Sequence, residues 1–354
     1  MTNMTTAINK EGPYKPSWID RFNNWVEKLP IPAWIFYVVF AFALLLVQIL
    51  FLWLDRGLQA VELLPVIIFN GLATPFVLAL IHLLDHQAVT ALNSMIPVLD
   101  MSEQDFIKYE YRLSNMPSLA VLIVGLTMAV FFILMERLWI MPVRYAALEQ
   151  FPVFAVVYQV IDKSSAFVFG GFLYHTIRQL RLVNAINSNH VHINLFNSGP
   201  LQAFSKLTAS TAVGLVVSVY VWMLLNPELL RDPVSFGFVG LNTILAIAVF
   251  VWPLSGVHRL MKMEKEKTLH EIDLRFEAVF SEFDQRFLED DNSAIERLHA
   301  TISSLEIQHN RITAIPTWPW RLETARFAFT AIALPLILMF LQFLAEQTFF
   351  RVMR

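Results

Sequence analysis

Seven long, predominantly apolar stretches dominate this sequence. A helix needs about 20 mostly apolar residues to cross the roughly 30 Å hydrocarbon core of a bilayer. The stretches that meet this requirement cover residues 32–54, 62–84, 117–141, 152–174, 207–225, 235–256 and 327–349. Because lipid offers no partners for backbone hydrogen bonds, single spans have to be helical. We therefore predict an all-α fold, a polytopic membrane bundle of seven transmembrane helices.

The composition agrees with a multi-pass membrane protein and excludes other classes. Hydrophobic residues make up 56% of the chain and charged residues 16%, against about 45–50% and about 25% in soluble domains. The net charge of −3 lacks the basic excess of nucleic-acid-binding proteins, so we expect the lipid bilayer and no nucleic acid as a partner. The chain contains no cysteine, which excludes disulfides and thiolate chemistry. We expect it in a cell membrane, either a plasma membrane or a bacterial inner membrane.

Lys and Arg residues are unevenly distributed between the segments that connect the spans. With the N-terminus inside, the cytoplasmic segments carry 19 of the 26 Lys and Arg residues and the outer segments carry six. If residues 152–174 did not cross, the inner count would fall to nine, which the positive-inside rule disfavours. We therefore expect the N-terminus inside and the C-terminus outside. This odd number of spans with an outer C-terminus resembles, in topology alone, the arrangement of insect chemosensory receptor channels.

The segment Ser17–Leu29 precedes the first span and has an amphipathic pattern. At helical spacing its apolar side chains gather on one side. These side chains are Ile19, Phe22, Trp25 and Val26. The pattern predicts a helix that lies on the inner membrane surface.

Residues 257–326 form the one long segment with the pattern of a soluble element. Apolar side chains recur at heptad-like spacing from Leu269 to Phe287 and again from Ile295 to Ile312. This pattern predicts a cytoplasmic antiparallel helical hairpin, a short coiled coil whose first helix continues the sixth span. We divide the chain into residues 1–256 (interfacial helix and six spans), 257–326 (hairpin and elbow) and 327–354 (last span, one unit with the first part).

The hairpin carries more apolar surface than one helix–helix contact readily covers. One interpretation is that it closes on itself or packs on the inner loops. The other is that its seams also join the subunits of a homo-oligomer. The candidate assembly residues are Phe276, Phe283, Phe287, Leu298 and Ile302.

The segment Ile315–Arg321 returns the chain from the hairpin to the last span. Pro316 and Pro319 disfavour a continuous helix through it. Trp318 and Trp320 are typical of a membrane interface. We expect a non-helical elbow anchored at the headgroups, and its use as a gating joint stays an alternative to a purely structural role.

Asp162 and Lys163 lie at the centre of the fourth predicted span. Ionisable groups at this depth are costly and mark functional sites by default. Helical spacing places Tyr158, Asp162 and Ser165 on one face, and it places Gln159 beside Lys163 on the adjoining face. The pair is therefore either part of an ion or proton pathway or a neutralised structural pair that fixes helix packing.

Lys163 needs a partner inside the membrane. No other predicted span has an Asp or Glu near its centre, so the expected partners are Asp162, water and the polar amides of other spans. These amides are Gln48, Asn70 and Asn242. The candidate pathway residues are Asp162, Lys163, Tyr158, Gln159, Ser165 and Asn70.

Prolines and glycines inside the spans affect helix geometry. Pro75 in the second span and Pro335 in the last one lack a backbone donor, so we expect each to interrupt its helix. Gly170 and Gly171 allow a neighbouring helix to approach the fourth span closely.

Three residues at the inner end of the second span suggest a metal site. His82, Asp85 and His86 follow i, i+3, i+4 spacing and could converge on an ion. The alternative is that these three side chains are polar groups at the helix end, at the membrane–water interface. The HxxHH box of membrane desaturases is absent, as are the Walker A, GxGxxG, GxSxG and HExxH motifs. We therefore expect no enzyme activity and no cofactor.

Together these patterns favour an oligomeric ion channel or other ion-conducting membrane protein, with polar groups of the fourth span near its pathway. The alternative is a membrane sensor or scaffold whose hairpin binds a cytoplasmic protein partner. A membrane-embedded, metal-dependent lipid enzyme is a third alternative.

Overall fold

The computed structural model describes residues 12–56, 60–137, 148, 150–191, 195–196, 199–225, 233–288 and 292–352. Within these ranges the side chains at 222, 233–236, 238, 286–288, 292–295, 339, 342–343 and 345–352 are outside the described set. The described residues form ten α-helices, three short 3₁₀ helices and two isolated β-bridges, which confirms the all-α prediction.

The α-helices follow one another along the chain with short connections. They are α1 (Trp18–Glu27), α2 (Ala33–Leu54), α3 (Leu64–Ser94), α4 (Glu103–Ser114), α5 (Ser118–Met135), α7 (Pro152–Asn189), α8 (Ala203–Leu225), α9 (Pro233–Leu288), α10 (Asn292–Thr313) and α11 (Leu322–Val352). The 3₁₀ helices are η1 (Val61–Leu63), η2 (Ile96–Val98) and η4 (Pro200–Gln202).

Six helices are long and apolar enough to cross a membrane. They are Ala33–Leu54, Val61–Ser94, Ser118–Met135, Pro152–Asn189, Pro200–Leu225 and Val239–Gln285. These six coincide with the first six predicted spans. The last predicted span, 327–349, falls on α11 and lies partly outside the described side chains. The seventh span and the orientation in the membrane stay predictions.

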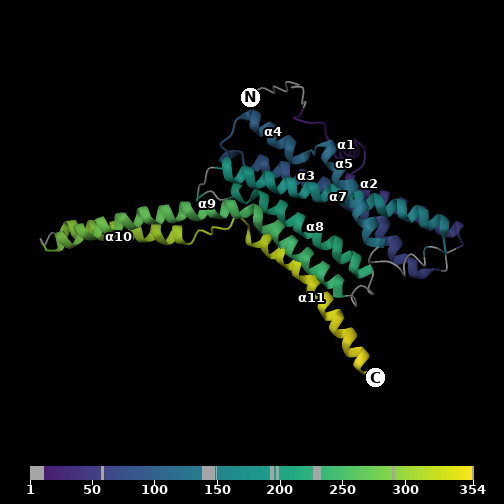
Figure 1. Ribbon diagram of the computed structural model, residues 1–354. Helices are drawn as coiled ribbons and strands as arrows, with labels where there is room; N and C mark the ends of the chain where they lie inside the picture. The colour runs from purple at the N-terminus through teal and green to yellow at the C-terminus, as the bar shows by residue number, and fades with distance from the viewer. Residues whose placement is uncertain are drawn as a thin grey trace.

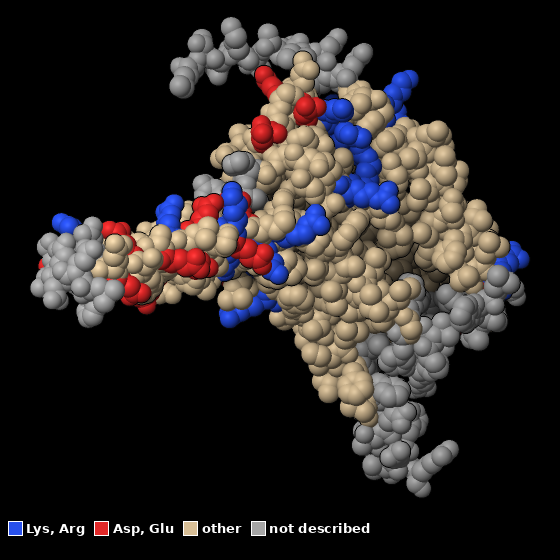
Figure 2. Space-filling model, turned by 60° about the vertical axis from the view of Figure 1, so that its left-hand side comes forward, with Lys and Arg blue, Asp and Glu red and all other residues tan. Residues whose placement is uncertain are grey.

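The spanning helices form a bundle from which an arm projects (Figure 1). Helix α9 leaves the bundle as the first half of the arm, and α10 runs back beside it. Helix α11 then leaves at an angle, with the C-terminus at its far end. Charged side chains cover the arm and one end of the bundle, whereas the rest of the visible bundle surface carries few (Figure 2). This distribution fits a bundle whose sides face lipid.

The arm confirms the predicted helical hairpin. Helix α9 is continuous over 56 residues, so the sixth span and the first hairpin helix are one element. Ile272, Leu305 and Ile312 are buried between the two helices, together with the partly buried Leu269 and Phe276. The heptad-like pattern therefore closes the hairpin on itself over this stretch.

The elbow after α10 is non-helical, as the two prolines predict. The Trp318 ring stacks between His258 of α9, at a centroid distance of 4.0 Å, and Trp320, at 4.4 Å. The Trp320 ring stacks in turn on Phe250, at 5.2 Å. The ammonium of Lys265 donates to backbone carbonyls at the end of α10 and in the elbow. These contacts fix the elbow against α9, and anchoring at the headgroups stays a prediction.

The prediction that Pro75 and Pro335 interrupt their helices is wrong. Helix α3 continues through Pro75 and α11 through Pro335 without interruption. Proline removes a single backbone donor, and packing against neighbours holds the rest of the helix together. At Gly71 the Leu45 side chain of α2 packs so closely that an added Cβ would lie 2.6 Å from it. The close approach expected at Gly170 is confirmed, because its Cβ would lie 3.0 Å from the Gly125 Cα of α5.

Helix α1 is present as predicted, but its buried face differs from the apolar side of the sequence pattern. Ile19 and Val26 are fully buried, whereas Trp25 is half-exposed. Asp20 and Asn23 are buried as well. Asp20 accepts from the Met116 amide and Asn23 accepts from the Tyr37 hydroxyl, and these bonds offset part of the loss of water.

Candidate functional site

A cluster of three ionisable side chains lies between α5 and α7 in the spanning part of the bundle. The Lys163 ammonium donates to the Asp162 carboxylate at 2.7 Å and forms an ion pair with the carboxylate of Glu136. The side chains of Lys163, Asp162 and Glu136 are 18%, 21% and 13% exposed. We call these three residues the charged triad.

Glu136 was missed by the sequence reasoning, which named Asp162, water and amides as partners for Lys163. Glu136 is the C-terminal cap residue of α5. It reaches Lys163 only because α5 packs lengthwise on α7. Its position at the end of an apolar run, next to Arg137, makes it look like a residue at the membrane surface. The sequence signal that could have indicated this contact was the pair Gly170 and Gly171, which allows another helix to approach α7 closely.

The predicted amide partners lie elsewhere. Asn70 donates to the Gln48 side chain and to the Tyr158 backbone carbonyl, both at 3.2 Å. Asn242 donates to a backbone carbonyl of α8. The prediction that these amides pair with Lys163 is therefore not met by the described contacts.

Two more candidate pathway residues lie along the same stretch of α7. Ser165 forms a 2.7 Å hydrogen bond with Thr74 of α3. Gln159 is partly buried. Polar groups of α3 and of the end of α5 thus contact α7 between Tyr158 and Ser165.

The triad carries unequal charge. If all three groups are ionised, two carboxylates face one ammonium. Burial of charge costs free energy unless each group is paired. In the triad the Lys163 ammonium contacts both the Asp162 and the Glu136 carboxylates.

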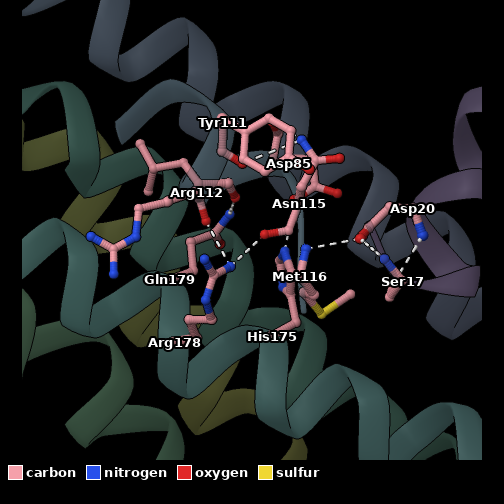
Figure 3. Close-up of polar contacts among 12 residues, drawn as sticks. Ser17, Asp20, Asp85, Tyr111, Arg112, Asn115, Met116, His175, Arg178 and Gln179 are labelled. Atoms are coloured by element: carbon pink, nitrogen blue, oxygen red, sulfur yellow. Dashed lines mark hydrogen bonds and ion pairs between the residues drawn. The ribbon is translucent and has the colours of Figure 1, made fainter. Parts of the chain in front are cut away.

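A second polar cluster joins α1, α3, α4, α5 and α7 at one end of the bundle (Figure 3). Asp85 of α3 accepts a 2.7 Å hydrogen bond from His175 of α7; the His175 side chain is buried and the Asp85 side chain is partly buried. Arg178 donates to the backbone carbonyls of Arg112 and Asn115 at the carboxyl end of α4. A cation at this position satisfies carbonyls that the helix leaves unpaired.

Asp20 links helix α1 to this second cluster. Its carboxylate accepts from the backbone amides of Ser17 and Met116, each at 2.8 Å, and so ties α1 to the start of α5. Burial raises the pKa of the Asp20 carboxyl to about 6. Burial also raises the pKa of Tyr14 to about 12, against the opposing effect of the Arg178 guanidinium beside it. The cluster explains why the polar face of α1 is buried.

The six long apolar helices, with lipid-compatible sides, identify a multi-span helical membrane protein. No family model, curated protein or solved structure matches the chain.

The three residues of the predicted metal site separate into two groups. Asp85 is bound to His175. His82 lies 3.0 Å from a carboxylate oxygen of Glu27, at the end of α1, and His86 lies near both. The spacing thus identified two of the three residues that come together, and Glu27 was missed because it is 55 residues from His82.

The predicted assembly residues lie on the arm. Phe276 contributes to the hairpin core, and Phe283, Leu298 and Ile302 are partly buried. The side chain of Phe287 is outside the described residues. Other apolar side chains in the described part of the hairpin are more exposed than these: Leu274, Phe280 and Ile307 are 52%, 49% and 55% exposed.

Proposed function

We propose that the protein is an oligomeric ion-conducting membrane protein with the charged triad in its cation pathway. The observation that supports this most is the meeting of two carboxylates and one mostly buried ammonium at helices α5 and α7. Asp162 and Lys163 are adjacent in α7, and Glu136 at the end of α5 joins them through Lys163. Ionisable groups in contact at this depth of a membrane bundle characteristically mark a functional site.

Partial exposure of the triad also supports a pathway. Between 13% and 21% of each side chain is accessible in the single chain. Charged groups in spanning helices characteristically face water or a bundle interior.

The arm supports assembly from several chains. Leu274, Phe280 and Ile307 leave apolar surface uncovered outside the spanning bundle. The usual reason for such surface outside the membrane is contact with another protein surface. A second copy of the chain offers the same seams, so we favour a homo-oligomer.

The test is cation flux into vesicles that contain the purified protein. Lys163→Met and Glu136→Gln each change the charge of the triad and are expected to change the flux several-fold. Ser164→Ala is the matched control, because Ser164 is exposed on the same helix and its hydroxyl donates to the Val160 carbonyl of that helix. Flux no higher than in protein-free vesicles, or equal in all variants, would refute the proposal.

Stability measurements separate a pathway from a dry structural pair. Removal of one partner from a buried pair typically costs about 3–5 kcal/mol, and apolar replacement of both partners restores stability. We expect the single variants to fold normally while their flux changes. Unfolded single variants rescued by the triple replacement Glu136→Gln, Asp162→Leu, Lys163→Met would favour the structural role.

A sensor or scaffold that binds a protein through the arm is the second candidate function. The projecting shape of the arm and its exposed apolar side chains support it (Figure 1). Replacement of Leu274, Phe280 and Ile307 by glutamine distinguishes the two. A smaller particle mass in detergent supports contact between copies, whereas an unchanged mass leaves the scaffold as the better explanation of the arm.

A further inference from the structure

A second site of a different kind lies at the junction of α1 and α3. Glu27 is the last residue of α1, and His82 and His86 occupy successive turns of α3. One carboxylate oxygen and one nitrogen of each imidazole lie within 4.8 Å of one another. This arrangement brings together two elements far apart in the sequence.

The His82 ring is held in place by a hydrogen-bonded chain. The Tyr37 hydroxyl donates to the Asn23 side-chain oxygen at 3.0 Å. Its single proton is thereby used, so its oxygen accepts from the Nδ1–H of His82, also at 3.0 Å. Such a partner fixes the tautomer of a metal-binding histidine in many proteins.

With the proton on Nδ1, the other ring nitrogen of His82 is a hydrogen-bond acceptor. The Nε2 atom lies 3.0 Å from Oε1 of Glu27. A lone pair and a carboxylate oxygen repel each other at this distance unless a cation lies between them. The cation is either a second proton on His82 or a metal ion.

His86 and Glu27 are placed to complete a metal site. Both side chains are exposed, and the His86 ring centroid lies 5.9 Å from that of His82. Within the described part of the chain the His86 ring has no hydrogen-bond partner. Zinc binds nitrogen and oxygen at about 2.0–2.2 Å, which places tetrahedral ligands about 3.3–3.5 Å apart. Rotation of two exposed side chains covers the remaining distance.

We propose that Glu27, His82 and His86 bind one divalent transition-metal ion of the zinc class. Two imidazoles and a carboxylate suit zinc and its neighbours, whereas magnesium and calcium prefer oxygen ligands. Three protein ligands leave a fourth position open to solvent. The ion would join the end of α1 to α3. The site is independent of the charged triad.

The test uses the full chain in detergent, stripped of metal with a chelator. Cobalt(II) is titrated and followed by visible absorption, and zinc is counted after dialysis. We expect one ion per chain, a tetrahedral cobalt spectrum and a higher unfolding temperature with zinc. His86→Ala and Glu27→Gln are expected to weaken binding at least tenfold. Both change exposed side chains, so folding should be kept.

The matched control is His270→Ala, an exposed histidine on the arm. It should bind cobalt as the unchanged chain does. Less than one ion per chain in the unchanged protein would overturn the proposal. So would equal affinity in His86→Ala, or a loss of binding in His270→Ala as large as in the ligand variants.

Discussion

Replacement of Gly170 by alanine tests how the two helices of the charged triad are held together. Gly170 of α7 lies against α5, where an added Cβ would be 2.8 Å from the Val124 carbonyl oxygen and 2.8 Å from the Met128 Cβ. Atoms in contact normally lie about 3.5–4.0 Å apart. One of the two obstacles is backbone, so a side-chain rotation cannot relieve the clash. The helices would have to separate.

The expected cost follows from this geometry. Overpacking of a tight contact typically costs about 1–3 kcal/mol. Alanine also gains up to about 1 kcal/mol over glycine in helix propensity. Gly240→Ala in α9 is the matched control, because no described atom lies within 4 Å of its Cβ position. The difference in unfolding free energy between the two variants therefore isolates the packing cost, about 1–3 kcal/mol.

The assay is reversible unfolding of both variants in mixed detergent micelles, followed by circular dichroism. We expect Gly170→Ala to be less stable than the unchanged chain and Gly240→Ala to be equal or more stable. Vesicle flux measured alongside should change in Gly170→Ala, since α5 carries Glu136 and α7 carries Lys163. If Gly170→Ala stabilised the protein as much as Gly240→Ala, the tight crossing would be refuted.

Three further predictions concern other polar contacts. The raised pKa of Asp20, about 6, means that its contribution to stability is complete below about pH 4 and is lost as the pH rises through 6. The unfolding free energy should therefore fall by about 2–3 kcal/mol between pH 4 and 7, and Asp20→Asn should lack this slope in thermal unfolding at each pH. Arg178→Met leaves two carbonyls of α4 without donors and should cost about 2–4 kcal/mol in the same assay; an unchanged melting temperature would contradict this. Lys265→Met removes the donor to the Thr313 and Ile315 carbonyls, so hydrogen exchange at the end of α10 should accelerate while exchange in the bundle stays constant.

The sequence predicted elements whose cause is local. Each of the first six spans is visible as an unbroken apolar run, because one helix has to satisfy its own backbone in lipid. The continuity of α9 could be predicted in part, since no Pro or Gly lies between the end of the sixth predicted span and the heptad pattern from Leu269, whereas Pro253 inside the helix gave the opposite indication. Asp162 was correctly predicted as a partner of Lys163, because the two residues are adjacent.

The sequence could not predict contacts that depend on how helices pack. Asp85 and His175 are 90 residues apart, and nothing in their local patterns connects them. Asp20 is not part of the apolar side of the α1 pattern, yet its carboxylate accepts from the Met116 amide before α5 and is buried. A local signal did exist: Ser17 and Asp20 form a capping box, which marks the start of the helix.

The glycine contact also explains why Lys163 reaches Glu136. Helices α5 and α7 run antiparallel and meet at Gly125 and Gly170. Glu136 is 11 residues along α5 from this contact, and Lys163 is seven residues along α7 in the same spatial direction. At 1.5 Å per residue these positions lie about 16 Å and about 10 Å from it. The difference between these two distances, ~6 Å, matches the length of an extended lysine side chain, whose flexible stem lets the ammonium reach a polar partner. The tight crossing thus sets the register in which one ammonium meets two carboxylates, and a helix pair held further apart would leave Glu136 without this partner.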